Sequence, residues 1–590
     1  MAIATGHTFS SGELLTAANL NTAVTGADIN AATITATGST TARSLATRAA
    51  DTVNVLDYGA VGDDAKGVTP TNDTPAFQAA IDSLGDGGGV VIVPSNKRYL
   101  IDGQLTIKKN VTLRTDKESP DNDAPNASYG LDYVKAALVL NDSAAQIRME
   151  MNCGLKGFHI LRKDNENTYP VSNAQANAWT GTAVFLVDYA ANVTISHCHI
   201  VGFEIAITND ATVSGAAQFR AEYLNIDCKS GIVLTKSVDV TYIENCHCWP
   251  IASQDGSNDV DNQRNGTAFR VQGTHDWTKF TNCFSFGYDR GFQVNGANSC
   301  TFLGCGADYT PAFRTVGGVV TGDSVGFQVY SNPASNGGAT ETNLIGCQAA
   351  GQTVGVFFDS ESSAASFGDT DTMKILGCSF WGTKSGGYAV KVVQGSGIVD
   401  SCSIRGGSYA FWFGGPDWNG VAVPAGNNSA ARWIISNNVF DADHGDETGS
   451  IDLENLVNNA FTNKELYTLA NNRFLNQSQT KVAFDIVGTN AIPELTVDTV
   501  EGAIYPSLDS RVVKITSTDN FGSILPVGCP AGRMLTIVAG AAFTVLDGGT
   551  YASAEMQLSG GSDFVMVAGD TLSLVFNGVY WHETGRGDNS

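Results

Sequence analysis

The chain has 590 residues, more than one ordinary hydrophobic core can organise, so it needs either several domains or one elongated repeat architecture. It carries 59 acidic against 34 basic side chains, a formal net charge of −25. This charge argues against a nucleic-acid partner, because phosphate contacts need concentrated lysine and arginine. No apolar run is long enough to span a bilayer, so we expect no membrane insertion.

Residues 1–50 are rich in alanine, threonine, serine and glycine and hold few aromatic side chains. This composition gives too little apolar bulk for an independent core, so we interpret the segment as an attachment region. The first residues, Met1 to His7, show neither the basic nor the apolar region of a secretory signal. We therefore expect synthesis in the cytosol without a signal peptide.

Residues 51–110 predict a compact unit that combines one helix with short strands. Thr74 and Pro75 suit the start of a helix, with Thr74 as its cap, and Phe77, Ala80 and Ile81 fall on one face. A glycine-rich run then ends this helix. Three apolar segments after it predict short strands at Val90–Pro94, Tyr99–Ile101 and Leu105–Ile107.

Three phrases of this unit resemble a known family. The runs Asn-Val-Leu-Asp-Tyr-Gly-Ala-Val-Gly-Asp (54–63), Pro-Ala-Phe-Gln-Ala-Ala-Ile (75–81) and Gly-Gly-Gly-Val-Val-Ile-Val-Pro (87–94) are similar to the opening of pectate-lyase-like β-helices, especially bacteriophage tailspike depolymerases. The resemblance implies an all-β, right-handed parallel β-helix whose N-terminal mouth is covered by the helix, as solenoids require. It also implies a homotrimer on the virion, joined to a phage tail or baseplate protein through residues 1–50. A bacterial surface polysaccharide, either capsule or O-antigen, is the implied partner.

Residues 111–492 contain two interleaved repeats that support a solenoid independently. One repeat reads apolar, any residue, then a small residue, Asn or His, then Cys, and its eight copies end at Cys198, Cys246, Cys283, Cys305, Cys347, Cys378, Cys402 and Asn438. The other reads Gly, apolar, any residue, apolar, and begins at Gly202, Gly231, Gly291, Gly326 and Gly355. Copies roughly 20 to 50 residues apart fit stacked strands joined by loops of variable length. We predict a bend at positive φ before each cysteine and cysteine side chains that point into the solenoid.

From about residue 493 the cysteine repeat stops and short alternating strands begin. They are expected at Met534–Val538, Phe543–Val545, Phe564–Val567 and Leu572–Phe576, with turn pairs of the Asp-Gly and Asn-Gly type between them. We predict that residues 493–590 form a β-sandwich. The tailspike resemblance implies a role for it in trimerisation and in glycan binding.

No metal and no cofactor is expected. Cys246, His247 and Cys248 are close in sequence, but strand alternation puts His247 on the face opposite the two cysteines, so the three cannot easily converge on a metal. The aspartates of the polar insertion 255–264 could offer calcium ligands, but they lack the register of an EF-hand. We interpret the insertion as a solvated loop, long enough to fold over a groove as its rim.

Glycosidase chemistry, which the resemblance implies, needs two carboxylates about 5 Å apart for retention or roughly 6.5 to 9.5 Å apart for inversion. Adjacent coils of a parallel sheet lie about 4.8 Å apart, so carboxylates on neighbouring coils meet this requirement. Asp289 and Asp308 follow successive cysteine bends and neighbour tyrosines, and we predict them as the catalytic pair. Glu244, two residues before a repeat cysteine, is the third catalytic candidate, and Asp400 and Glu204 also face outward.

Sugar recognition favours aromatic faces and planar polar groups on a rigid surface. The middle third of the chain offers six such side chains as predicted substrate-binding residues: Tyr288, Arg290, Tyr309, Trp277, Trp249 and Trp381. Together with the carboxylates and the resemblance, they predict a tailspike that binds a bacterial surface polysaccharide and depolymerises it as an endo-glycosidase.

Two other functions fit the same scaffold. A polysaccharide lyase would abstract the proton next to a uronic carboxylate, and Tyr288, Arg290 and Lys279 offer side chains for that step. A non-catalytic receptor-binding fibre would use the same aromatic residues without an acid pair. The sequence has no GxSxG, Walker or HExxH motif, which lowers the expectation of an α/β-hydrolase, an NTPase or a zincin.

Overall fold

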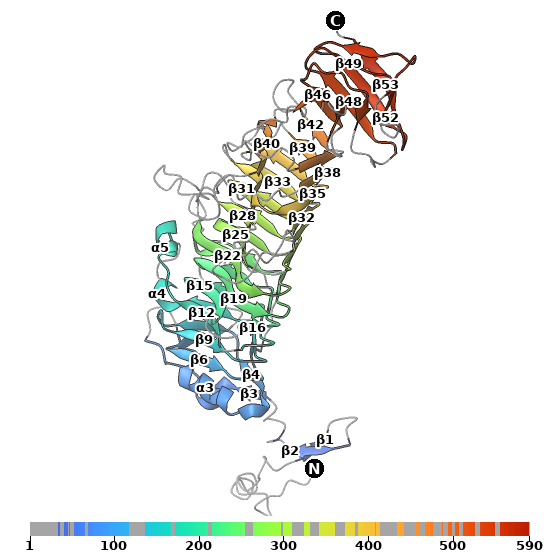
Figure 1. Cartoon of the computed structure of the whole chain (residues 1–590). Coiled ribbons are helices and arrows are strands. Elements are labelled where there is room, and N and C mark those ends of the chain that lie inside the picture. Colours follow the sequence, from blue (N-terminus) through green and yellow to red (C-terminus); the bar gives the residue numbers. More distant parts are fainter. Residues whose placement is uncertain are drawn as a thin grey trace, which may run out of the picture. The chain divides into compact units, whose positions relative to one another are not determined.

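The computed structural model describes residues 33–35, 40–44, 47, 52–64, 69–116, 136–166, 171–187, 189–209, 215–253, 263–296, 299–308, 324–330, 341–359, 372–383, 387–406, 409–413, 433–441, 455–459, 467–470, 472–475, 486–487, 494–497, 499, 502–506, 511–524, 531–548 and 555–588. The chain forms two compact units, the first made of residues 1–461 and 465–485 and the second of residues 462–464 and 486–590. The protein is all-β, and the first unit is a right-handed parallel β-helix (Figure 1).

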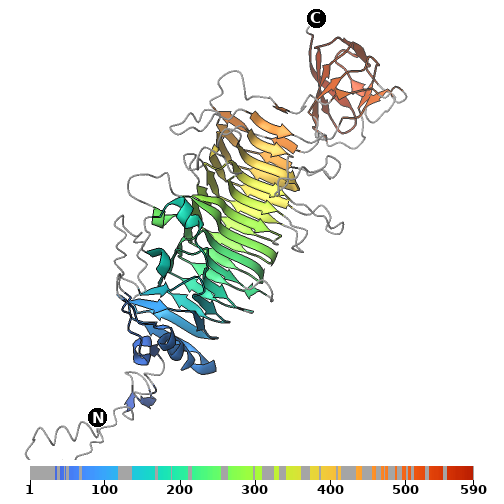
Figure 2. The ribbon, with the colours of Figure 1, turned by 90° about the vertical axis from the view of Figure 1, so that its left-hand side faces the viewer.

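Each coil of this solenoid contributes one strand to each of three parallel sheets (Figure 2). Sheet 1 contains β3 (Thr52–Asn54), β4 (Gly89–Val93), β7 (Val111–Thr115), β10 (Gly154–Lys156), β13 (Thr194–Ser196), β17 (Arg220–Glu222), β20 (Tyr242–Glu244), β23 (Lys279–Thr281), β26 (Thr301–Leu303), β29 (Thr342–Ile345), β32 (Thr372–Leu376), β35 (Ser396–Asp400), β38 (Trp433–Ser436) and β41 (Tyr467–Ala470). Sheet 2 contains β5 (Arg98–Ile101), β8 (Ala137–Leu140), β11 (His159–Arg162), β14 (His199–Val201), β18 (Asn225–Asp227), β21 (His247–Cys248), β24 (Phe284–Phe286), β27 (Gly306–Asp308), β30 (Gln348–Ala350), β33 (Ser379–Thr383), β36 (Ser403–Gly406), β39 (Val439–Asp441) and β42 (Arg473–Leu475). Sheet 3 contains β6 (Gln104–Ile107), β9 (Gln146–Met149), β12 (Thr182–Leu186), β15 (Ile205–Asn209), β19 (Ser230–Val238), β22 (Arg264–His275), β25 (Tyr288–Asn295), β28 (Val325–Tyr330), β31 (Val354–Asp359), β34 (Tyr388–Gln394), β37 (Tyr409–Phe413) and β40 (Asn455–Asn459), and β16 (Ala216–Ala217) pairs with β19 beside it.

The N-terminal end of the solenoid carries helix α3 (Thr74–Asp82) and the 3-10 turn η2 (Val55–Tyr58). Phe77, Ala80 and Ile81 of α3 are buried, which confirms the predicted apolar face. The predicted cap was wrong by one residue, because Asp73 occupies that position. The carboxylate of Asp73 does not cap the helix but accepts the loop N–H of Val61 at 2.7 Å.

Each repeat cysteine follows a residue at positive φ, as the sequence predicts. These bend residues are His197, Asn245, Asn282, Gly304, Gly346, Gly377, Ser401 and, before Asn438, Asn437, with φ between 50° and 62°. Main-chain bonds join successive bends: the N–H of His197 donates to the carbonyl of Glu222 at 3.0 Å, and that of Tyr223 to the carbonyl of Glu244 at 3.1 Å. All eleven cysteines in the part of the chain that the structure describes are buried free thiols. The cysteine ladder is therefore part of the interior packing.

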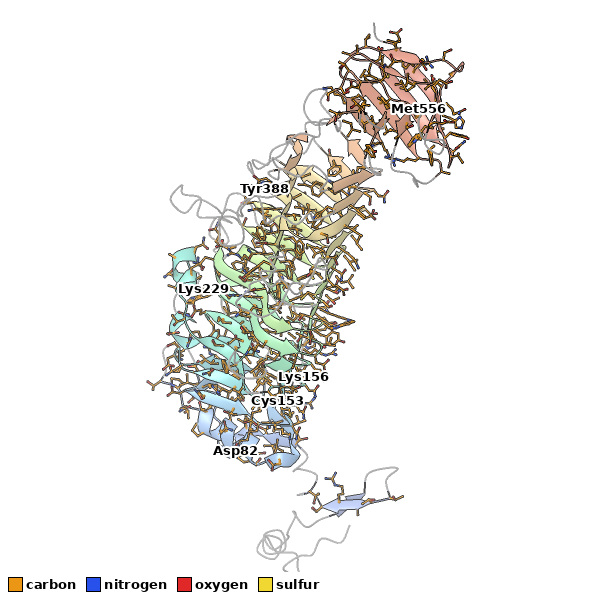
Figure 3. The ribbon with its side chains drawn as sticks, in the orientation of Figure 1. Asp82, Cys153, Lys156, Lys229, Tyr388 and Met556 are labelled. Atoms are coloured by element: carbon orange, nitrogen blue, oxygen red, sulfur yellow. The ribbon has the colours of Figure 1, made fainter. Side chains whose placement is uncertain are left out.

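Phenylalanine rings of sheet 3 stack inside the solenoid at the spacing of the coils. The ring centroids of Phe269 and Phe292 lie 4.9 Å apart, and those of Phe292 and Phe327 lie 4.8 Å apart. Gly291, which precedes Phe292, is required by close packing, because a Cβ at this position would stand 2.8 Å from the carbonyl oxygen of Gly326 on the next coil. The second repeat therefore combines a close strand approach with an inward apolar ladder, and the side chains fill the interior (Figure 3).

The second unit has its own hydrophobic core. Its largest sheet is mixed and runs in the order β44 (Glu494–Leu495), β46 (Val512–Ile515), β48 (Met534–Ala539), β52 (Thr571–Phe576), β53 (Trp581–Gly587) and β50 (Met556–Gln557). Smaller ladders pair β45 (Ala503–Ile504) with β47 (Ser523–Ile524) and β49 (Phe543–Val545) with β51 (Phe564–Met566). The strand β43 (Ile486–Val487) pairs with β40 and is the last strand of sheet 3. Leu535 and Leu574 of the large sheet share one core with Phe543 and Phe564 of the small ladder. Two layers of strands therefore enclose this core.

The remaining elements are short. They are the antiparallel pair β1 (Thr33–Thr35) and β2 (Ala42–Ser44), the turns η3 (Gly85–Gly87) and η4 (Ile251–Ser253), and the helices α4 (Lys163–Glu166) and α5 (Asn173–Asn177). In the described ranges, no helix has the length and the apolar character that crossing a membrane requires.

Candidate functional site

The outer face of sheet 2 carries two rows of side chains that run from coil to coil. Parallel register aligns the first outward position of successive strands, which is occupied by His199, Asn225, His247 and Phe284. The third position forms a second row with Phe286, Asp308, Ala350, Trp381 and Arg405. Trp249 continues this row from β21, because its N–H still donates to Ile226 of the neighbouring coil at 2.9 Å. Residues between the two rows, such as Cys248 and Ala307, are buried in the core.

A cleft of about 480 Å³ opens over the first row. Ten residues line it: His199, Tyr223, Asn225, Asn245, Cys246, His247, Trp249, Ile251, Asn282 and Phe284. The His247 ring stacks beside Trp249 with centroids 5.7 Å apart and an interplanar angle of 10°, and Phe284 meets His247 edge-on at 5.2 Å. The cleft therefore offers a rigid aromatic floor.

The polar groups of the cleft are carboxamides and imidazoles. The Nε2 atom of His199 lies 2.8 Å from the amide nitrogen of Asn225, and Asn282 donates to Asn245 at 3.5 Å. An amide nitrogen can only donate, so Nε2 of His199 accepts this bond. Burial lowers the pKa of His247 to about 4, which leaves its ring neutral at physiological pH. Among the described residues that line the cleft there is no aspartate, glutamate, lysine or arginine.

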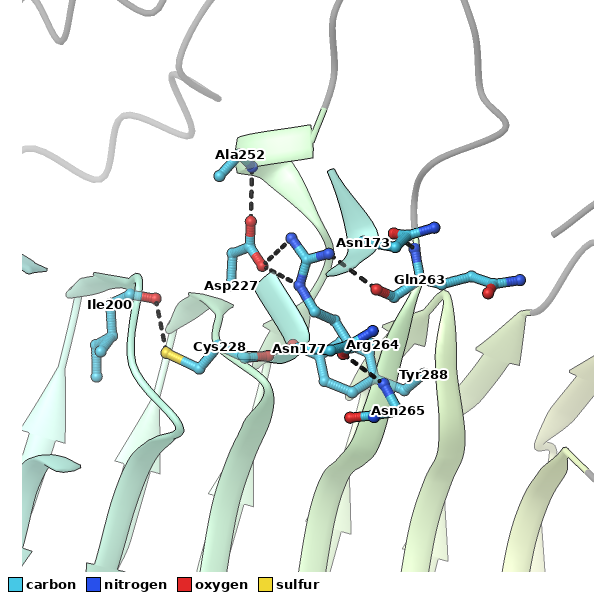
Figure 4. Close-up of polar contacts among 10 residues, drawn as sticks. All are labelled: Asn173, Asn177, Ile200, Asp227, Cys228, Ala252, Gln263, Arg264, Asn265 and Tyr288. Carbon is cyan, nitrogen blue, oxygen red and sulfur yellow. Dashed lines mark hydrogen bonds and ion pairs between the residues drawn. The ribbon is translucent and has the colours of Figure 1, made fainter. Parts of the chain in front are cut away.

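A buried ion pair anchors one wall of the cleft (Figure 4). The Nη2 atom of Arg264 lies 2.7 Å from Oδ1 of Asp227, and both side chains are fully buried. The other carboxylate oxygen of Asp227 accepts the N–H of Ala252 at 2.6 Å, and the Arg264 guanidinium lies 5.0 Å over the Trp179 ring. Because Ala252 follows Ile251, these contacts hold the wall segment against the outer face of sheet 2.

Helix α5 adds a second attachment for the same insertion. Asn173 accepts the N–H of Gln263 at 2.7 Å, and Asn177 accepts the N–H of Asn265 at 2.9 Å (Figure 4). A capping box at Ser172 fixes the start of this short helix. Ala252 before the predicted rim 255–264, and Gln263 and Asn265 at its end, are thus held by hydrogen bonds, while residues 255–262 lie outside the described residues.

The predicted catalytic pair lies on adjacent coils at the corner between sheets 2 and 3. The N–H of Gly287, two residues before Asp289, donates to the carbonyl of Asp308 at 3.0 Å. Tyr288 and Ala307, which directly precede the two aspartates, are buried in the core, so strand alternation turns both aspartates outward. Both carboxyl-bearing residues are half-buried, and Asp308 is the register partner of Phe286 in the second row.

The predicted substrate-binding residues divide between several places. Trp249 lines the cleft, and Trp381 is 41% exposed in the row of Asp308, two coils further on. Trp277 is 57% exposed but lies at the bend from sheet 3 to sheet 1. Arg290 lies in sheet 3 and donates from Nε to Oε1 of Gln328 at 2.9 Å. Tyr309 lies outside the described residues.

Tyr288 is a correction to the predicted substrate-binding set. It is only 2% exposed, and its hydroxyl donates to the carbonyl of Cys228 at 2.8 Å inside the solenoid. Its ring therefore cannot contact a glycan on the outer face. The physical reason is the bend at Gly287, which turns the first residue of β25 inward and the second outward.

Glu244 lies on the outer face of sheet 1, which is a different face from that of the cleft. Its register partner on the neighbouring coil is Glu222, a carboxylate that the sequence analysis missed. Arg220 pairs with Glu222 at 3.1 Å and lies 4.8 Å over the ring of Tyr242. Lys279, the lyase candidate, lies 6.0 Å from the same ring. Sheet 1 therefore holds its own cluster of charges.

The two remaining carboxylate candidates have structural partners. Asp400 accepts hydrogen bonds from Ser436, Ser401 and Asn437, and these bonds hold the pKa of Asp400 below its usual value. Glu204 lies 3.5 Å from Lys229. Across the ranges that the structure covers, no group of three His, Cys, Asp or Glu side chains could hold a metal ion.

Several lining residues were missed although a signal for them exists. His199, His247 and Phe284 each directly follow a repeat cysteine, at Cys198, Cys246 and Cys283. An inward cysteine makes the next residue outward, so the repeat alignment alone identifies this row. The opposite orientation of His247 and the two neighbouring cysteines was predicted correctly.

The described fold and face define a right-handed parallel β-helix protein with an aromatic cleft on its side. No family model matches the chain, and no curated protein matches it. Among solved structures, it is similar to the catalytic unit of a thermostable GH87 α-1,3-glucanase from Streptomyces thermodiastaticus, with 14% identity, a TM-score of 0.45, and coverage of 74% of this chain and 70% of that one. It is also similar to a mutant of the tailspike protein of E. coli bacteriophage HK620 in complex with a pentasaccharide, with 12% identity, a TM-score of 0.44, and coverage of 92% and 96%. A third similar structure is gp49, a tailspike protein and capsular polysaccharide depolymerase of Acinetobacter baumannii bacteriophage Fri1, with 14% identity, a TM-score of 0.33, and coverage of 78% and 68%.

Proposed function

We propose that this protein is a phage tailspike that binds a bacterial surface polysaccharide on the outer face of sheet 2 and cleaves it as an endo-glycosidase. The observation that carries the proposal is the position of Asp289 and Asp308. They are half-buried on adjacent coils, next to the aromatic row that extends from Trp249 to Trp381. Asp289 comes three residues after Phe286, the register partner of Asp308, so the two carboxylates stand on adjacent coils across the corner between sheets 2 and 3. The proposal requires a separation within the roughly 5 to 9.5 Å that glycosidases use.

The proposed reaction needs no further reagent besides water. One carboxyl group, protonated at the start, gives its proton to the glycosidic oxygen as the bond to the anomeric carbon breaks. The other carboxylate either attacks the anomeric carbon or removes a proton from the attacking water. Water supplies the hydroxyl of the new reducing end and restores the proton of the acid, so the pair is unchanged after each turnover.

Digestion of polysaccharide from a strain on which the purified protein forms a halo tests this proposal. Asp289→Asn and Asp308→Asn should each reduce the release of oligosaccharides by about a thousandfold, because each removes a proton donor or acceptor of the reaction. Glu222→Gln and Glu244→Gln are the matched controls, since they change a second carboxylate pair on adjacent coils of sheet 1. Full activity in both aspartate variants would remove the assignment, and loss in the glutamate variants would move the site to sheet 1.

A non-catalytic receptor-binding fibre is the second candidate, because the described cleft itself is lined without any carboxylate. Such a protein would adsorb to its host and leave the polysaccharide chain length unchanged. A lyase has weaker support, since Tyr288 is buried and Arg290 is bonded to Gln328. Products that absorb as unsaturated uronides would nevertheless identify a lyase.

The proposed tailspike is a homotrimer on the virion, attached to a phage tail or baseplate protein through residues 1–50, with the second unit contributing to assembly. Exposed apolar side chains on the outer face of sheet 1 support self-association: Leu303 and Ile345 stand on neighbouring coils, and Ile434 stands three coils further on. Sedimentation velocity of the full chain should give a trimer. A monomer at micromolar concentration would contradict this part of the proposal.

A further inference from the structure

We propose that the cleft of sheet 2 is a subsite for an uncharged sugar residue, such as a neutral hexose or an N-acetylhexosamine, and that it excludes uronic and sialic acids. This inference rests on the proposed polysaccharide binding and names the class of sugar that the cleft takes. It follows from what lines the cleft, from how the buried arginine of the cleft wall is used, and from the charge of the whole chain.

The lining of the cleft offers nothing that would compensate a negative charge. Its described hydrogen-bonding side chains are Asn225, Asn245 and Asn282, the two imidazoles of His199 and His247, the hydroxyl of Tyr223 and the indole N–H of Trp249. A sugar carboxylate placed there would lose its hydration without meeting an arginine or lysine, and desolvation of an unpaired charge is costly. A hydroxyl or acetamido group loses less, because carboxamides can both donate to it and accept from it.

The imidazole of His247 does not supply the missing charge at neutral pH, because burial lowers its pKa to about 4. The Nε2 atom of His199 is already engaged by the amide nitrogen of Asn225 at 2.8 Å. Both rings add flat polar surface to the cleft.

The cation behind the cleft wall is already neutralised. Arg264 is fully buried, paired with Asp227 at 2.7 Å, and donates from Nη1 to the carbonyl of Gln263 at 3.0 Å. The net charge of −25 adds a repulsion that an approaching polyanion would feel and a neutral glycan would not. Electrostatics of the chain and of the cleft thus favour the same class of sugar.

The cleft has positive features for such a residue. The stacked faces of His247 and Trp249 and the edge of Phe284 suit the C–H faces of a pyranose ring, while the asparagines reach its hydroxyl groups. A volume of about 480 Å³ lies within the range of roughly 300–1,000 Å³ that small-ligand sites occupy.

The test is whether a positive and a negative charge, placed in the cleft in turn, change the affinity for polysaccharide in opposite directions. Asn225→Lys and Asn225→Asp place opposite charges on the cleft floor, and binding is measured on polysaccharide purified from a strain to which the unmodified protein adsorbs. For an uncharged sugar both variants should weaken binding by about tenfold, and affinity should change less than about twofold between 50 and 500 mM NaCl. Thr106→Lys and Thr106→Asp are the controls, because Thr106 also faces outward from a coil but lies on sheet 3. They should leave binding unchanged.

Phe284→Lys and Phe284→Glu provide a second pair with opposite signs at a position that tolerates substitution, since Phe284 is 37% exposed. Tighter binding of both lysine variants than of the matching acidic variants, by tenfold or more, would show an anionic sugar in the cleft and overturn the inference. Unchanged binding in all four variants would show that the cleft is not a subsite and would also overturn it. Adsorption of the unmodified protein to no encapsulated or smooth strain would instead contradict the proposed function.

Discussion

The outer faces of sheets 1 and 2 share one geometry and differ in chemistry. On sheet 1, Arg220 pairs with Glu222 at 3.1 Å and covers the ring of Tyr242, so the polar side chains of these coils bind one another. On the same coils of sheet 2, His247 and Trp249 stand beside an open cleft. Parallel stacking of the coils therefore sets the spacing of about 4.8 Å but does not determine the chemistry of either face. The cleft lies where His247 and Trp249 face outward and the segment at Ile251 and Ala252 borders them.

The largest difference between the two faces should be the contribution of their ion pairs to the free energy of unfolding. Asp227→Ala leaves the Arg264 charge buried and unpaired, and we expect it to lower the free energy of unfolding by about 3 to 5 kcal/mol. It should also raise hydrogen exchange at Ala252, whose N–H loses its acceptor. Urea unfolding and hydrogen exchange measure the two effects.

The control for this prediction removes both charges. Asp227→Leu combined with Arg264→Met should recover most of the lost stability, because two apolar side chains replace a buried pair. A destabilisation below about 1 kcal/mol for Asp227→Ala would mean that the wall is not held by this pair.

A somewhat smaller effect on the free energy of unfolding is expected when the pH is lowered. Burial lowers the pKa of His247 from 6.5 to about 4, so between these values the unfolded chain binds a proton that the folded chain does not. Stability therefore rises with pH through this window and is fully present above about 6.5. Acidification from pH 7 to pH 4 should cost up to about 3 kcal/mol through this residue.

His247→Gln removes that contribution, and the difference between the two unfolding curves isolates it from other groups. His275 is also buried with a pKa of about 4, so the unmodified protein alone cannot give the value for His247. Parallel pH profiles of the variant and the unmodified protein would contradict the burial of this imidazole.

Sequence alone anticipated the solenoid better than the site, for a physical reason. Inward positions are fixed by packing, so the bends before Cys198 and Cys402 and the stacked Phe292 could be predicted from a repeat. The site depends on which sheet an outward residue reaches. Glu244 faces outward, as the candidate residues of sheet 2 do. It precedes the bend at Asn245, however, and therefore lies on sheet 1.

Other features of the site carried no local signal. Asp227, at the end of β18, and Arg264, at the start of β22, are 37 residues apart in the sequence and meet because they lie on adjacent coils. Tyr288 follows the bend at Gly287, which turns its side chain inward. The sequence next to a candidate aspartate does not show whether a tyrosine points inward or outward. The sequence pairs Asp289 with Asp308 because they follow successive cysteine bends, and this pairing stays a prediction.

A third comparison concerns aromatic residues on the two faces. Trp249→Ala should weaken polysaccharide binding about tenfold, because it removes the ring that stacks beside His247 in the cleft. Tyr242→Ala changes an aromatic ring on the same coil that lies between Arg220 and Lys279 on sheet 1, and binding should not change. Isothermal titration with purified polysaccharide measures both. Equal losses would mean that the glycan crosses from one sheet to the other.

The smallest effect is expected for Arg220→Ala. Arg220 is partly exposed and its pair with Glu222 is accessible to water, so we expect a loss of less than about 1 kcal/mol that shrinks further in 0.5 M salt. Urea unfolding of the full chain measures it. A loss above about 2 kcal/mol that persists in salt would contradict an exposed pair. It would mean instead that another copy of the chain covers this face of sheet 1, because only desolvation gives a surface ion pair that much weight.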